Sequence, residues 1–259
     1  MSAIIFDCDG VLADTEHDGH LPAFNQTFKE FNLPVQWSEA DYNEKVQIGG
    51  GKERMASILT PDFVQKAGLP SDAEEQSKML VEWHLRKTDI YKEMVKGGRL
   101  PGRPGIARLT EEAIAAGWTL VVASTSAEES VRTVLEFVVG KQQATHFHVF
   151  AGDMVPKKKP APDIYLLAKE RLNLSPQDTL AIEDSRNGLM AAVGAGFRCL
   201  VTVSTYSKHE DLSEALLVVS DLGEPNSPMR IIANRSRAKP GDYITLEDVK
   251  ACIETYNLN

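Results

Sequence analysis

The stretch AIIFDCDG, residues 3–10, decides the fold, because four apolar residues run directly into two aspartates and a glycine. A short apolar run of this kind is typical of a fully buried strand. Gly10 allows the chain to turn sharply, so the carboxylates of Asp7 and Asp9 stand where the strand ends. The sequence therefore predicts a central buried strand with a charged site at its carboxyl end.

The same pattern recurs along the chain. Five further apolar runs read as buried strands, at residues 118–125, 148–153, 179–185, 198–204 and 216–221. Stretches with helical spacing separate them, at residues 104–117, 127–139, 162–172 and 187–195. Ser126 is a plausible N-cap for the second of these helices. Alternation of strands and helices predicts an α/β fold with a doubly wound, Rossmann-like parallel sheet that is covered on both faces.

One long segment breaks the alternation. Residues 14–97 contain no convincing strand, and their apolar residues recur at helical spacing in residues 22–32, 51–59 and 73–96. A cluster of glycine and proline follows. We therefore predict a helical cap domain at residues 15–97, inserted into an α/β core formed by residues 1–14 and 98–259. After about residue 222, loops and one terminal helix at 245–257 are expected.

Composition narrows the classes of protein. The 259 residues are 42% hydrophobic and 25% charged, which is typical of globular proteins and argues against disorder and a membrane protein. With 28 Lys and Arg against 37 Asp and Glu, the net charge is −9, so no nucleic-acid or membrane partner is expected. The three cysteines, Cys8, Cys199 and Cys252, lack metal-site spacing and are expected to be buried thiols in a reducing compartment.

Two further expectations concern the location and the assembly of the protein. The chain begins in an apolar run without a secretory or transit leader, so secretion is not expected. We expect the plastid stroma, for a mature form, or the cytoplasm. We also expect a monomer.

Polar residues occupy the ends of the other predicted strands. Ser124 ends the second run, Glu183 and Asp184 end the fourth, and Lys159 follows the third just before a helix. In a doubly wound sheet these ends converge on one site. Crowded carboxylates repel one another, and an all-oxygen ligand set favours Mg²⁺, which with Lys159 would neutralise a phosphate. Each motif alone is also compatible with a turn, a helix cap or a solvated charge run, but together they predict a pocket for a phosphoryl group.

The cap carries its own candidate site. In IGGGKERM, residues 48–55, three glycines precede Lys52 and Arg54, which suits a second anion. The alternative is a flexible turn that leads into a solvated basic helix. Glu16 and His20 are placed to bind sugar hydroxyls, and Lys87 lies on a cap helix, but each of the three taken alone is more typical of a surface residue than of a ligand.

Four motifs carry a resemblance to a known superfamily. They are FDCDGVLADTE (6–16), VVASTS (121–126), KKKPAPDIY (157–165) and LAIEDSRNG (180–188). In this order they resemble the haloacid dehalogenase-like phosphohydrolases. The insertion after the first motif resembles the helical cap of that superfamily.

The resemblance implies roles for the core residues. Asp7 would be the nucleophile that forms an aspartyl phosphate, and Asp9 the general acid and then the general base. Ser124 and Lys159 would hold the phosphate. It implies Mg²⁺ as cofactor, with four ligand groups: the Asp7 carboxylate, the Asp9 carbonyl, Glu183 and Asp184.

Further segments resemble one group within the superfamily, the CbbY-type xylulose-1,5-bisphosphate phosphatases. They are DTEHDGHLPAFNQTF (14–28), IGGGKERM, HLRKT (84–88), RPGIARL (103–109), AGDMVPKKKPAPDIY (151–165) and IEDSRNGL (182–189). This likeness implies a sugar-bisphosphate substrate that inhibits rubisco in the Calvin cycle. It also implies substrate contacts in the cap, from Glu16, His20, Gly50, Lys52, Arg54 and Lys87.

Alternatives remain open at this point. A β-phosphoglucomutase or a phosphoglycolate phosphatase would share the core motifs. A receiver-type signalling module, which accepts phosphate without turnover, would share the aspartates, the hydroxyl and the lysine.

Overall fold

The computed structural model describes residues 2–48, 50–97 and 100–255, which form two compact units. One unit is Met1–Asp14 with Pro101–Asn259, and the other is Thr15–Leu100. The predicted second boundary, between residues 97 and 98, falls beside residues 98–99, which lie outside the described part of the chain. We describe each unit by itself.

The first unit is built on one sheet of seven strands in the order β3-β2-β1-β4-β5-β6-β7. The strands are β1 (Ala3–Phe6), β2 (Thr119–Ala123), β3 (Phe147–Phe150), β4 (Thr179–Glu183), β5 (Arg198–Thr202), β6 (Leu217–Val219) and β7 (Ile231–Asn234). The six predicted strands are confirmed and pair in parallel, with β1 between β2 and β4. The doubly wound architecture therefore places the carboxyl ends of β1, β2 and β4 side by side.

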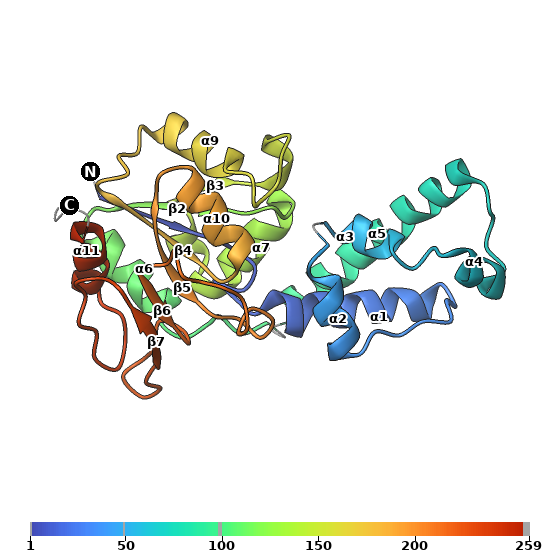
Figure 1. Cartoon of the computed structure of the whole chain (residues 1–259), viewed down its shortest axis with the longest axis horizontal. Coiled ribbons are helices and arrows are strands. Elements are labelled where there is room, and N and C mark those ends of the chain that lie inside the picture. Colours follow the sequence, from blue (N-terminus) through green and yellow to red (C-terminus); the bar gives the residue numbers. More distant parts are fainter. Residues whose placement is uncertain (1, 49, 98–99, 256–259) are drawn as a thin grey trace. The chain divides into compact units, whose positions relative to one another are not determined.

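Helices cover both faces of this sheet, which explains why its strands are apolar throughout (Figure 1). The helices are α6 (Ile106–Ala115), α7 (Glu128–Val139), α8 (Lys141–Ala144), α9 (Asp163–Leu172), α10 (Arg186–Gly194) and α11 (Leu246–Glu254), with a 3₁₀ turn, η2 (Gly152–Met154). Helix α6 packs against α7 and α11, and α9 packs against α10. All four residues of β1 are fully buried, so the central strand contacts apolar side chains on both faces.

The seventh strand was not predicted from sequence. Strand β7 pairs antiparallel with β6 at the edge of the sheet, with an irregularity in the register. Ile231 and Ile232 are 47% and 56% exposed, so β7 is not a fully buried strand of the kind that the other strand predictions describe. The expectation of loops in this part of the chain is therefore wrong for residues 231–234, whereas the terminal helix is confirmed as α11.

The second unit is helical, as predicted, and its described residues contain no strand. Its helices are η1 (Glu16–His20, a π-helical turn), α1 (Leu21–Glu30), α2 (Glu39–Lys45), α3 (Gly51–Ala56), α4 (Pro61–Ala67) and α5 (Ala73–Lys96). Helix α1 packs along α5. Rings of Phe24, Phe28, Trp37 and Tyr42 form an aromatic cluster with centroids 4.8–6.3 Å apart. This cluster gives the small unit an apolar core of its own.

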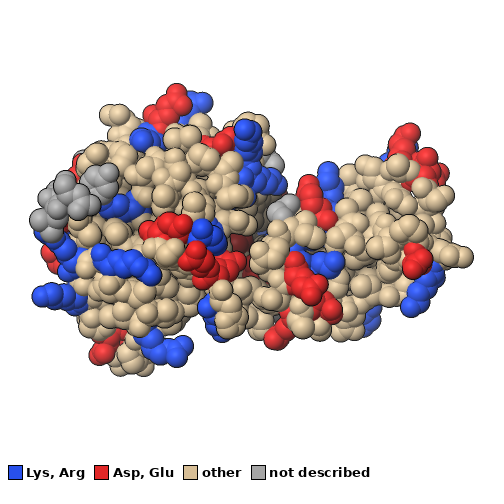
Figure 2. All heavy atoms as spheres, in the orientation of Figure 1, with Lys and Arg blue, Asp and Glu red and all other residues tan. Residues whose placement is uncertain are grey.

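Other expectations concern the cysteines, membrane spans and surface charge. The three cysteines are free and buried, as predicted. Across the described residues, no helix combines the length and the apolar content that a membrane span requires. On the face drawn in Figure 2, Lys and Arg side chains are scattered among Asp and Glu.

Arg103 ties the strand ends of the first unit together. Its guanidinium donates to the carbonyl oxygens of Gly10, Thr202 (3.1 Å), Val203 (2.7 Å) and Ser220 (2.5 Å), which follow or end β1, β5 and β6. A guanidinium has five N–H donors in a rigid plane, so one side chain can satisfy several carbonyl groups. Arg103 therefore links three loops on the edge of the sheet that carries the polar strand ends.

We predict that Arg103→Met lowers the free energy of unfolding by about 3 kcal/mol, because it leaves partly buried carbonyl oxygens without a donor. Urea denaturation followed by circular dichroism measures the change. Arg132→Ala is the control, because among the described residues the Arg132 side chain pairs with Glu128 alone, on the exposed surface of α7, and its loss should cost less than about 0.5 kcal/mol. Equal effects of the two substitutions would contradict this role of Arg103.

Candidate active site

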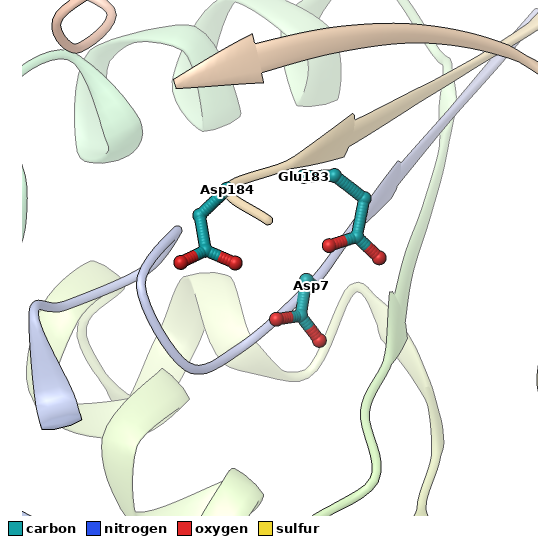
Figure 3. A group of neighbouring side chains, drawn as sticks. All are labelled: Asp7, Glu183 and Asp184. Carbon is teal, nitrogen blue, oxygen red and sulfur yellow. The ribbon is translucent and has the colours of Figure 1, made fainter. Parts of the chain in front are cut away.

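Three carboxylates converge at the carboxyl ends of β1 and β4 (Figure 3). Asp7 follows β1, Glu183 ends β4, and Asp184 is the next residue. Each offers an oxygen atom that lies within 4.8 Å of the other two, and all three residues are buried. Parallel pairing of β1 with β4 in register, Phe6 opposite Ile182, is what brings these positions together.

Lys159 is the cation at the centre of this cluster. Its Nζ donates to Asp7 Oδ1 at 2.7 Å, to Glu183 Oε1 at 2.6 Å and to the carbonyl oxygen of Ala123 at 2.9 Å. Burial alone would lower the pKa of Lys159, but the carboxylates of Asp7 and Glu183 outweigh it and raise the pKa above its ordinary value. The ammonium is therefore charged and fixed between three strand ends.

Glu183 is held by more than the lysine. The hydroxyl of Tyr165, on α9, also donates to Glu183 Oε1. The second oxygen, Oε2, is buried and has no hydrogen-bond partner among the residues that the structure describes. A Cβ atom on Gly188 would lie 1.8 Å from that oxygen, so only glycine leaves room for the carboxylate. Glu183 thus has one oxygen committed to Lys159 and Tyr165 and one still available.

Electrostatics at the site favour a further cation. Burial, together with the carboxylates of Glu183 and Asp9, raises the pKa of Asp7 to about 7 although Lys159 opposes the shift. Burial, together with the carboxylates of Asp7 and Glu183, raises the pKa of Asp184 well above its ordinary value. An oxygen-only donor set with an available buried carboxylate oxygen fits Mg²⁺. Asp7, Glu183 and Asp184 are the side chains of the described residues that would hold it.

The turn after β1 brings the main chain at Gly10 close to the side chain of Asp184. Gly10 has φ +85°, and a Cβ atom there would lie 2.1 Å from Asp184 Oδ2. A side chain at this position would therefore strain the backbone and push Asp184 away. Gly10 therefore allows the loop that carries Asp7 and Asp9 to lie close to Glu183 and Asp184. The turn that the sequence predicted at Gly10 is confirmed.

Ser124 and Ser126 lie at the end of β2. Ser124 is fully buried, and its Oγ accepts the backbone N–H of Ser126 at 3.1 Å. The hydroxyl of Ser126 donates to Asp9 Oδ2 at 2.5 Å. The N-cap of α7 is Ala127, with no side-chain cap, so the predicted N-cap role of Ser126 is wrong. The hydroxyl instead reaches across to the loop after β1.

In the cap unit, Arg54 and Glu16 form an ion pair. Arg54 Nη1 lies 2.7 Å and 2.9 Å from the two oxygens of Glu16, and the hydroxyl of Tyr42 donates to Glu16 Oε2 at 2.5 Å. The Arg54 side chain is only 11% exposed. Arg54 therefore belongs to a buried network, and Lys52 differs from it: Lys52 is exposed and makes no ion pair with described residues.

His20 and Lys87 also lie together in the cap unit. Lys87 Nζ is 2.6 Å from His20 Nδ1, and the ammonium lies 4.6 Å from the ring centroid of Phe24. Lys87 is 5% exposed, so it is not a surface residue. Gly50 has φ +102° and precedes α3, which starts at Gly51 and carries Lys52 and Arg54. The structure thus places the six predicted cap residues in one unit and pairs four of them.

Three polar residues of these networks were not identified as functional from the sequence. Tyr165 lies within the quoted KKKPAPDIY motif, but nothing in the sequence indicates that its hydroxyl contacts Glu183. Ser126 was identified only as a helix cap. Tyr42 has no local signal, because its partners, Glu16 and Arg54, lie 26 and 12 residues away in the chain.

Comparison with known proteins gives consistent matches. The model of the haloacid dehalogenase-like hydrolases matches residues 1–196. A CBBY-like protein of Arabidopsis thaliana is 43% identical over 225 residues, 86% of this chain and 70% of that protein. A mutant of CbbY from Rhodobacter sphaeroides, solved in complex with xylulose 1,5-bisphosphate, has a TM-score of 0.75 at 38% identity, over 85% of this chain and 94% of that one. A β-phosphoglucomutase of Bacillus subtilis is 31% identical over 76% of this chain and 80% of its own length.

The raised pKa of Asp7 predicts pH-dependent metal binding. Mg²⁺ competes with the proton for the carboxylate, so its apparent affinity rises with pH and is lost as the pH falls through about 7. We expect Mg²⁺ to bind about tenfold more weakly at pH 6 than at pH 8, as isothermal titration calorimetry would show. Unchanged affinity between these two pH values would contradict the site.

A pair of adjacent substitutions provides the control. Asp184→Ala removes one of the three carboxylates and should weaken Mg²⁺ binding by more than about tenfold. Ser185→Ala removes only the N-cap of α10, whose Oγ accepts the N–H of Gly188, and should leave Mg²⁺ affinity nearly unchanged.

Proposed function

The chain belongs to the haloacid dehalogenase-like hydrolases and, within them, to the CbbY group, and from this premise we propose that it hydrolyses xylulose 1,5-bisphosphate to xylulose 5-phosphate. As a member of that hydrolase family it is a phosphoric monoester hydrolase. The non-turnover receiver module considered above is therefore excluded.

The observation that carries the choice of substrate is the likeness to CbbY of Rhodobacter sphaeroides, which was solved with xylulose 1,5-bisphosphate bound. Lys52 supports it, because an exposed ammonium beside a glycine-rich turn suits a second phosphate. Arg54 is less suited to that role than the sequence suggested, because its charge is neutralised by Glu16. We therefore assign the distal phosphate chiefly to Lys52.

The first chemical step is transfer of the phosphoryl group to Asp7. A carboxylate oxygen of Asp7 forms a bond to phosphorus while the bond between phosphorus and the sugar oxygen breaks. Asp9 gives its proton to the departing sugar oxygen. Lys159 stabilises negative charge on the transferring phosphoryl group, and Ser124 donates a hydrogen bond to it. Bound Mg²⁺, held by Asp7, Glu183, Asp184 and the Asp9 carbonyl, would supply additional positive charge.

The second step releases phosphate. The Asp9 carboxylate takes a proton from water as that water attacks phosphorus. The bond between phosphorus and the Asp7 oxygen breaks, which restores the Asp7 carboxylate, and Asp9 is protonated again for the next cycle. Lys159 remains in place through both steps because Glu183 and the Ala123 carbonyl hold it independently of Asp7.

The cap residues are proposed to bind the sugar. Glu16, His20 and Lys87 would contact its hydroxyl groups, and Gly50 would present its backbone to the phosphate. Their pairing with Arg54, Tyr42 and one another fixes these side chains before any ligand arrives. Preorganised groups lose little conformational entropy on binding, which favours selectivity for one sugar.

A β-phosphoglucomutase is the second candidate, because such an enzyme of Bacillus subtilis shares 31% identity with this chain. A mutase returns the phosphoryl group to a sugar instead of to water. Incubation with a glucose phosphate distinguishes the two: isomerisation supports the mutase, and release of inorganic phosphate from xylulose 1,5-bisphosphate supports the phosphatase.

The setting is part of the proposal. An enzyme that removes an inhibitor of rubisco acts where rubisco acts, so we propose the plastid stroma or the cytoplasm. We further propose that it works as a monomer on a small sugar phosphate, without nucleic-acid or membrane partners.

We predict that Lys52→Ala lowers kcat/KM for xylulose 1,5-bisphosphate by about 10–100-fold, in line with the loss of a charge-assisted hydrogen bond. The same variant should lose less than about threefold on 4-nitrophenyl phosphate, which has no second phosphate. Steady-state kinetics on both substrates gives the ratio.

Lys66→Ala is the control, because Lys66 is also an exposed lysine of the cap unit but lies on α4. It should be neutral on both substrates. Equal losses on both substrates for Lys52→Ala, or a wild-type preference for monophosphates, would contradict the proposal that Lys52 binds the distal phosphate.

A further inference from the structure

Ser126 contacts the residue that is proposed to move the proton. Its Oγ lies 2.5 Å from Asp9 Oδ2, although 117 positions separate the two residues in the sequence. The hydroxyl does not cap α7, whose N-cap is Ala127. Among the described residues, Asp9 is thus the partner of the Ser126 side chain as a hydrogen-bond donor.

The backbone of Ser126 is fixed on both sides. Its N–H donates to Ser124 Oγ at 3.1 Å, and its carbonyl oxygen accepts the N–H of Gly152 at 3.0 Å. A Cβ atom on Gly152 would lie 2.1 Å from the carbonyl oxygen of Thr125, so glycine is needed for this close approach. The hydroxyl therefore projects from a rigid platform at the ends of β2 and β3.

The loop that carries Asp9 is also held. The N–H of Gly10 donates to the carbonyl oxygen of Ala13 at 2.8 Å, and the N–H of Leu12 donates to that of Cys8 at 3.0 Å. These bonds fix the main chain, but they do not set the direction of the Asp9 carboxylate. The bond from Ser126 constrains that direction.

We propose that Ser126 is a positioning residue that orients the carboxyl group of Asp9 for proton transfer to and from the reacting oxygen. This inference rests on the role of Asp9 in the proposed function. A hydroxyl both donates and accepts, so it can bond to the Asp9 carboxylate and also to the protonated carboxyl group. Ser126 can therefore hold Asp9 through the whole cycle, in the acid step and in the base step.

This role predicts a dependence on the leaving group. The sugar or glycerol oxygen of an alkyl phosphate is a poor leaving group that needs a proton, whereas 4-nitrophenolate departs without one. Since kcat/KM reports steps up to the first irreversible one, it isolates transfer to Asp7. Loss of orientation at Asp9 should therefore lower kcat/KM for alkyl esters much more than for aryl esters.

The experiment compares β-glycerol phosphate with 4-nitrophenyl phosphate in the full-length protein. Ser126→Ala should lower kcat/KM by about 10–100-fold for the alkyl ester and by less than about threefold for the aryl ester. It should lower kcat for both esters, because hydrolysis of the phosphorylated Asp7 needs Asp9 as base in either case. Ser126→Thr keeps the hydroxyl and should restore most of the alkyl activity.

Two controls separate positioning from structure. Ser185→Ala removes a helix N-cap beside the site and should affect both esters equally. Ser126→Cys is similar in size but a weaker donor, so, as in Ser126→Ala, kcat/KM should fall more for the alkyl ester than for the aryl ester. With two variants, the test does not depend on the folding of either one.

Equal losses of kcat/KM on the two esters in Ser126→Ala and Ser126→Cys, or no recovery in Ser126→Thr, would overturn the inference. Failure of the proposed substrate is a separate result. If the wild-type protein does not hydrolyse xylulose 1,5-bisphosphate, the substrate assignment is wrong, and the ratio between alkyl and aryl esters still decides the role of Ser126.

Discussion

The ammonium of Lys159, fixed at 2.7 Å from Asp7 and 2.6 Å from Glu183, is the interaction on which the site depends. Burying an unpaired charge is costly, so neither the lysine nor the two carboxylates would be stable here alone. One cation does not balance the cluster, because Asp184 and Asp9 lie next to it and the pKa of Asp7 stays raised. The remaining negative charge is what makes the site suited to a divalent metal and to a phosphoryl group that Lys159 can bind.

The sheet makes this arrangement possible. Parallel strands β1, β2 and β4 end at the same edge, so Asp7, Ser124 and Glu183 meet although they are far apart in sequence. Gly10 and Gly188 then allow carboxylates to approach at distances that any side chain would block. Arg103 binds the carbonyl groups of the neighbouring loops, which keeps these ends together. The chemistry thus depends on close approaches that the backbone permits at a few positions.

The sequence predicted the buried strands and the charged strand ends, because both are local patterns. Strand β7 was missed because it is only four residues long and lies between the turn-rich stretches GEPNSP (223–228) and RSRAKPGD (235–242), so its two isoleucines did not distinguish it from a loop. Contacts between residues far apart in the chain could not be predicted from the sequence either, because the pairing of Arg54 with Glu16 and of Tyr165 with Glu183 depends on tertiary packing. The sequence therefore identified Arg54 as a cation, but only the structure showed that its charge is already neutralised.

Detection of the phosphorylated nucleophile tests the central claim most directly. Wild-type protein would be mixed with substrate and Mg²⁺, quenched rapidly in acid, reduced with borohydride and digested for peptide mass spectrometry. Reduction converts an aspartyl phosphate to homoserine, so the account predicts homoserine at position 7 in place of Asp7, only when substrate was present. Modification at another carboxylate, or turnover without any modified peptide, would contradict the assignment of Asp7 as nucleophile beside Lys159.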